Sequence, residues 1–218
     1  QDGEPATLLD DVAARLDLLI TAIFGESWPI RIAQPPAHAT MLAIFFRHDR
    51  KPRQRIAVPA TDGFSLWLPR DLDLGDIGQT VSLFRTMAMQ QVVRARRGSA
   101  TAMRDNLRPL EADVYLLLEA HAADFELAEL LPGMASGIDQ LRQLALKRRP
   151  PLQQFPRSRQ PLEALYQSLL ELPAGQHHDR GPRTDSPEAS LAQASALITQ
   201  LALVPDDCRE QHLGPRPL

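Results

Sequence analysis

The stretch PLEADVYLLLEAHAADFELAELL, residues 109–131, decides the fold class of this chain. Apolar residues recur in it at steps of three and four, which is the spacing of one face of an α-helix. That face comprises Leu110, Val114, Leu117, Leu118, His121, Phe125 and Ala128, and it is widened by Leu116, Leu127 and Leu130. An apolar surface this broad is typical of a helix at the centre of a protein core. The sequence therefore predicts a helical domain built around residues 109–131.

The same periodicity marks five further segments on either side of this one. They are residues 7–24 ending at Gly25, a segment from an Asp76 cap to Gly98, residues 134–149, a segment starting with Pro161, and residues 187–203 capped by Ser186. A polar cap before each segment, or a glycine or proline after it, fits the usual signals for helix ends. The pattern predicts five to six helices in all.

Between residues 28 and 68 the pattern changes to short apolar runs that are separated by turn residues. The runs are WPIRIAQ (28–34), TMLAIFF (40–46), QRIAV (54–58) and FSLWL (64–68). Thr61–Gly63 is a strong turn signal, and it predicts a hairpin that joins residues 55–59 to residues 64–68. The prolines that flank the runs favour edge strands, because proline cannot donate to a strand ladder. We expect a small antiparallel sheet.

Together these elements predict an α+β fold that is mostly helical, with the sheet near the N-terminus. We expect a helical domain over 1–172 with the sheet at about 27–69 and a linker or disordered loop over 173–186. A final helix over 187–204 and a polar tail over 205–218 follow. The chain has no initiator Met, so we expect a processed product or an excised piece of something longer.

Composition and charge exclude several classes of function. The chain has 218 residues, a formal net charge of −3 and one cysteine, Cys208. It therefore lacks the basic excess of a dedicated nucleic-acid binder and cannot form an intramolecular disulfide. No apolar run approaches the roughly 18 residues of a membrane span, so we expect a cytoplasmic protein with no membrane or nucleic-acid partner.

The common catalytic motifs are absent from the sequence. Neither lysine belongs to a phosphate-binding loop, no glycines are spaced as in a dinucleotide fingerprint, and no histidine lies in HExxH. His177 and His178 stand beside Asp179 in a polar linker that offers no scaffold for a metal. His121 lies on an apolar helix face, where a core histidine is the expected role. We predict no catalytic residue, no metal site and no cofactor.

Two basic clusters and several aromatic residues are candidates for binding a partner protein. Arg94, Arg96 and Arg97 end one predicted helix, and Lys147, Arg148 and Arg149 end another. Basic residues at these positions also stabilise a helix by offsetting its dipole. If the two clusters lie side by side, they form a positive patch suited to an acidic protein surface. Trp28 and Phe64 are the aromatic candidates, since aromatic residues anchor many interfaces, whereas we expect Trp67 in the core.

Three segments resemble the N-terminal region of one known family. A helix is followed by SWPIRIAQPP (27–36), then by VPATDGFSLWLP (58–69), and then by a helix with MAMQQVVRARRGS (87–99). This order resembles the CbbO/NorD family of adaptors, and the resemblance covers residues 7–172. Those proteins carry a C-terminal von Willebrand factor A domain and serve hexameric MoxR-type AAA+ ATPases. The metal-binding DxSxS motif of that domain does not occur in this chain.

The resemblance implies a non-catalytic adaptor that couples a MoxR-type ATPase hexamer to a client enzyme held by the absent C-terminal domain. CbbO is the favoured branch, in which the client is Rubisco and inhibitory sugar phosphates are removed from it. A NorD-type role in activating nitric oxide reductase is an alternative. A regulatory domain that binds a small ligand near residues 62–76, and an enzyme with scattered catalytic groups, are further alternatives that the sequence leaves open.

Overall fold

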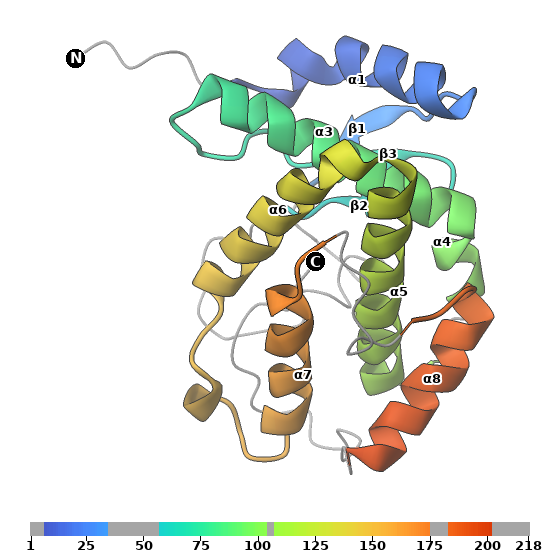
Figure 1. The fold of residues 1–218 in the computed structure, drawn as a ribbon, viewed down its shortest axis with the longest axis vertical. Helices are drawn as coiled ribbons and strands as arrows, with labels where there is room; N and C mark the ends of the chain where they lie inside the picture. Colours follow the sequence, from blue (N-terminus) through green and yellow to red (C-terminus); the bar gives the residue numbers. More distant parts are fainter. Residues whose placement is uncertain (1–6, 35–56, 104–106, 175–182, 202–218) are drawn as a thin grey trace.

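Helix α5 (Pro109–Leu130) runs through the middle of the molecule in the computed structural model, as its broad apolar surface predicts (Figure 1). The structure describes residues 7–34, 57–103, 107–174 and 183–201. Six more α-helices lie within these ranges: α1 (Leu9–Phe24), α3 (Ile77–Arg97), α4 (Ser99–Ala102), α6 (Ala135–Arg148), α7 (Gln160–Glu171) and α8 (Pro187–Gln200). Single 3₁₀ turns at Pro132–Met134 and Leu152–Gln154 precede α6 and α7. The predicted α+β class, mostly helical with a sheet near the N-terminus, is confirmed.

Helix ends follow the predicted signals closely. The Asp76 carboxylate accepts from the Gln79 N–H at the start of α3, and α3 stops at Gly98, whose φ of 76° is left-handed. Ser186 caps α8 by accepting from the Ala189 N–H. Helix α4 was not predicted, because its four residues are too few to display a helical period.

The sheet is mixed, so the prediction of an antiparallel sheet is wrong. Its strands are β1 (Ile30–Ile32), β2 (Ala60–Thr61) and β3 (Leu66–Leu68), in the order β1-β3-β2. A hairpin is present, since β2 pairs antiparallel with β3, but its first strand is Ala60–Thr61 and not the predicted 55–59, of which 57–59 form no strand. Strand β1 lies parallel to β3. An apolar run does not reveal the direction of its strand, and only strands joined by a tight turn are bound to be antiparallel. The predicted strand at 40–46 lies outside the described residues.

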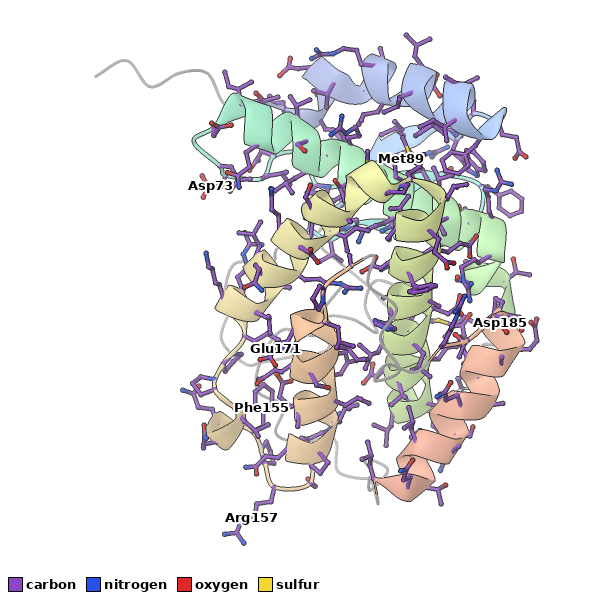
Figure 2. The ribbon with its side chains drawn as sticks, in the orientation of Figure 1. Asp73, Met89, Phe155, Arg157, Glu171 and Asp185 are labelled. Atoms are coloured by element: carbon purple, nitrogen blue, oxygen red, sulfur yellow. The ribbon has the colours of Figure 1, made fainter. Side chains whose placement is uncertain are left out.

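The buried apolar residues form two clusters. The first lies among α1, the sheet and α3, and it includes Met89, which is seen between α1 and α3 in Figure 2. The second lies among α5, α7 and α8 and includes Tyr115, Tyr166 and Ile198. Helix α5 contributes its C-terminal half to the first cluster and its N-terminal half to the second. Because α8 packs along α5, the last helix is part of the same body.

Helices α3 and α6 cross at Gly137. A Cβ atom on Gly137 would lie 2.2 Å from the Oγ1 atom of Thr86 on α3. The crossing is therefore close enough to require glycine.

Candidate partner-binding surface

The two basic clusters do not form a shared patch. The end of α3, with Arg94, Arg96 and Arg97, lies beside α4, whereas the end of α6, with Lys147, Arg148 and Arg149, lies at the opposite side of Figure 1. The two helices diverge from their crossing, so their C-terminal ends point away from each other. Each cluster must be judged by itself.

Arg97 is buried inside the molecule and has several partners. Its guanidinium donates to both carboxylate oxygens of Glu119 at 3.2 and 3.1 Å, to Glu126 at 3.0 Å and to the Thr184 carbonyl at 3.1 Å. Its side chain is 7% exposed. Arg97 therefore holds α3, α5 and the start of α8 together and offers little surface to a partner.

Arg149 is also buried, whereas its two neighbours are exposed. Its guanidinium pairs with Glu163 and lies 5.0 Å from the ring centre of Tyr166, both on α7. Lys147 and Arg148 are exposed at the end of α6. Only these two members of the second cluster are available to a partner protein.

The end of α1 meets the end of α3 through an aromatic contact. Trp28 is buried, and its ring meets the Phe24 ring edge to face with centres 6.5 Å apart. The Arg96 guanidinium lies 5.2 Å from the centre of the Phe24 ring, and Arg96 is exposed. A guanidinium stacked on an aromatic face loses little entropy on binding, because its orientation is already limited.

Phe64 lies at the tip of the β2–β3 hairpin and is 79% exposed. The Asp62 carboxylate accepts from the Phe64 and Ser65 N–H groups at 2.8 and 2.7 Å. The Thr61 hydroxyl accepts from the Gly63 N–H and donates to the Ser65 carbonyl. Side chains of this kind fix a turn by replacing backbone hydrogen bonds. The Phe64 ring is thus held out toward solvent by a well-braced turn.

Strand register brings Phe64 to the same end of the sheet as Trp28. Ile30 pairs with Leu66 in the parallel ladder, and the Leu66 N–H donates to the Pro29 carbonyl. Trp28 and Phe64 each lie two residues before a member of that pair. We call the group of Phe24, Trp28, Phe64 and Arg96 the aromatic corner.

Phe24 was not among the residues predicted to bind a partner. Its helical periodicity indicates a core position, yet it is only partly buried and forms the platform for both Trp28 and Arg96. The sequence signal that could have identified Phe24 is its position, directly before Gly25, which ends the helix, and four residues before Trp28.

A buried polar layer lies along α5 where one apolar cluster gives way to the other. It consists of Gln90 and Arg97 from α3, Glu119 and Asp124 from α5, and Arg142 from α6. Burial raises the pKa of Glu119, but hydrogen bonds from Arg97, Ser190 and Ser99 outweigh that effect and hold the pKa below its usual value. Asp124 accepts from Gln90 at 2.6 Å and from two nitrogens of Arg142 at 3.1 and 2.9 Å.

His121 is mostly neutral at pH 7. Burial lowers its pKa to about 4, with a further contribution from the positive charge of Arg142. In the described part of the chain, no three histidine, cysteine, aspartate or glutamate side chains come together as a metal site would require. His177, His178 and Cys208 lie outside it.

None of the helices in the described ranges is long and apolar enough to span a membrane. Comparison with known proteins gives no match to any family model, curated protein or solved structure.

Proposed function

We propose that this chain is a non-catalytic adaptor domain that docks onto a MoxR-type AAA+ ATPase ring through the aromatic corner. The observation that carries the proposal is the 79% exposed Phe64, held by a turn that Asp62 and Thr61 brace. Burying a phenylalanine side chain is worth about 1.5–3 kcal/mol. A partner that covers this ring gains that free energy and spends little on ordering the loop.

Arg96 adds charge to the apolar part of the corner. Aromatic residues and arginine are the most frequent anchors of protein interfaces. The ring surface that fits here has an apolar pocket for Phe64 and a carboxylate within reach of the Arg96 guanidinium.

The resemblance to the CbbO/NorD family supports this choice of partner. The three segments that carry it, residues 27–36, 58–69 and 87–99, supply Trp28, Phe64 and Arg96 respectively. Each of the segments that suggest an ATPase adaptor thus contributes one residue to the aromatic corner, of which Phe64 and Arg96 are exposed. In this role the chain works in the cytoplasm and couples ATP hydrolysis on the ring to a client, for which Rubisco is the favoured candidate.

The test compares Phe64→Ala with Leu18→Ala in binding to a MoxR-type hexamer. Leu18 is 70% exposed on α1 and lies outside the corner, so it is a matched control for loss of an exposed apolar side chain. Neither change removes a core contact. We expect Phe64→Ala to weaken binding by about 2 kcal/mol, or roughly 30-fold, as for an interface anchor, and Leu18→Ala to leave it unchanged.

The affinity is measured by fluorescence anisotropy of the labelled chain, and the ATPase rate of the hexamer is followed in parallel. Absence of binding and of any rate change with the wild-type chain at micromolar concentration would refute the adaptor role. Equal losses in both variants would refute the corner as the docking site. Because the client is expected to bind the absent C-terminal domain, distinguishing Rubisco from nitric oxide reductase needs the longer protein in gel filtration with the hexamer.

A further inference from the structure

Arg96 is an exposed cation whose side chain is already held in place. Its guanidinium lies over the Phe24 ring, 5.2 Å from the ring centre. Among the described residues, no carboxylate or carbonyl group accepts a hydrogen bond from it, in contrast to Arg97, which pairs with Glu119 and Glu126. A guanidinium that lies over a ring has one face covered, and the N–H groups along its rim remain free to bind an acceptor.

The backbone at Arg96 is fixed by the residue that follows it. Arg97 donates to two acids of α5 and to the Thr184 carbonyl, and these bonds tie the end of α3 to α5 and to the start of α8. The helix then stops at Gly98, whose φ of 76° is left-handed. A partner that binds Arg96 therefore spends little conformational entropy on ordering this part of the chain.

The Phe24 ring is fixed in its turn by the protein core. Phe24 is the last residue of α1, and the left-handed Gly25 ends the helix directly after it. The ring meets the buried Trp28 edge to face, and it packs against the first apolar cluster. Trp28 thus holds Phe24, and Phe24 limits where the Arg96 guanidinium can lie.

We propose that Phe24 is a positioning residue of the docking site, and that it presents Arg96 to an aspartate or glutamate side chain of the partner ring. This inference rests on the proposed function, because it names the group that the aromatic corner recognises. A carboxylate is planar, and its two oxygens match two N–H groups of a guanidinium, so the pair forms two parallel hydrogen bonds. A lysine ammonium lacks this fork of donors and is a poor substitute for Arg96.

The test is a double-mutant cycle in binding to a MoxR-type hexamer, measured by fluorescence anisotropy of the labelled 218-residue chain. Phe24→Leu removes the ring, and Arg96→Met removes the charge but keeps a side chain of similar bulk. Arg85→Met is the control for loss of a cation, because Arg85 is exposed on the same helix. Phe24→Tyr keeps the aromatic face, and Arg96→Lys keeps the charge without the fork of donors.

We expect Arg96→Met to weaken binding about tenfold and Arg85→Met to leave it unchanged. Arg96→Lys should still weaken binding about threefold or more. Phe24→Leu should weaken binding about threefold to fivefold in the wild-type chain, the worth of a cation–π contact, but less than about twofold in the Arg96→Met chain, because the ring acts through Arg96. Phe24→Tyr should bind within about twofold of the wild type.

The order of the Arg96 side chain in the free protein is a readout that needs no partner. Relaxation of the Arg96 Nε–H group in ¹⁵N NMR should give a lower order parameter in Phe24→Leu than in the wild type, and Phe24→Tyr should keep the wild-type value. An unchanged order parameter in Phe24→Leu overturns the positioning role.

The binding results separate this inference from the adaptor role itself. Equal losses from Phe24→Leu in the wild-type and Arg96→Met chains would mean that the ring only supports the fold, and would overturn the proposal. Binding that is weakened by Phe64→Ala but not by Arg96→Met overturns this inference and leaves the adaptor role standing. Absence of wild-type binding refutes the adaptor role and this inference with it.

Discussion

Replacing Gly137 with alanine tests the close crossing of α3 and α6. The added Cβ atom would lie 2.2 Å from Oγ1 of Thr86, 3.2 Å from its Cβ and 3.3 Å from its Cγ2. Thr86 is buried, and its hydroxyl donates to the Ser82 carbonyl at 3.0 Å. Rotating the threonine cannot remove the contact with its Cβ, so the two helices must move apart.

Two opposing effects set the size of the change. Overpacking a well-packed interface costs about 1–3 kcal/mol. Alanine in place of glycine inside a helix gains about 1 kcal/mol of helix propensity. The close approach to Thr86 Oγ1 places the cost in the upper part of this range, about 1.5–3 kcal/mol, so we expect Gly137→Ala to lower the free energy of unfolding by about 0.5–2 kcal/mol.

Urea unfolding followed by circular dichroism measures this change, and two further variants make it specific. Gly78→Ala is the matched control on α3, because a Cβ there meets only Asp76 Oδ1 at 3.4 Å, and it should stabilise the protein by about 0.5–1 kcal/mol. In a Thr86→Ala background, Gly137→Ala should cost less by about 1 kcal/mol, since Oγ1, the nearest obstacle, and Cγ2 are gone while the Cβ atom of residue 86 remains. A Gly137→Ala variant as stable as the wild type, or a cost that Thr86→Ala leaves unchanged, would show that the crossing is looser than described.

Three further predictions concern the buried acid, the hairpin turn and the histidine. Glu119→Gln should lower the free energy of unfolding by about 3–5 kcal/mol, because it leaves buried Arg97 without its main counter-charge. Glu126→Gln should lower it by under about 1 kcal/mol. Urea titrations that give the two variants equal losses would contradict this. Asp62→Ala removes the acceptor of two N–H groups in the hairpin, so we expect a loss of about 1 kcal/mol and faster amide exchange at Phe64 and Ser65, measured by NMR. The folded-state pKa of His121, about 4, lies below the value of about 6.5 expected in the unfolded chain, so the unfolded state binds more protons between these values. Stability should therefore fall as the pH drops from about 6.5 to 4, by up to about 1.4 kcal/mol per unit, and His121→Gln should flatten this slope in unfolding curves taken across that range.

The helical part of the fold could be predicted from the sequence because its signals are local. Asp76, Gly98 and Ser186 mark helix ends through contacts within a few residues, and the stripe on residues 109–131 reports burial directly. The direction of β1 could not be predicted, because it depends on how residues far apart in the chain are brought together.

The candidate site was predictable only in part for the same reason. Trp28, Phe64 and Arg96 stand out as residue types. The register of β1 and β3 brings Trp28 and Phe64 to one end of the sheet, and the contact of Arg96 with Phe24 brings α3 to α1. Arg94, Arg97 and Arg149 look like their exposed neighbours in sequence. Their burial depends on whether α5, α7 or α8 covers them. Residue type and spacing along one helix do not reveal that.

Because α5 belongs to both apolar clusters, its position also affects how fast its amide groups exchange with solvent. Amide groups exchange with solvent through local openings whose free energy rises with the number of packed partners that must be released. An opening of α1 or of α8 disturbs one cluster, whereas the middle of α5 becomes exposed only when both give way. The amides around Leu118 and Ala123 should thus be the slowest to exchange, and their rate reports the global unfolding of the chain.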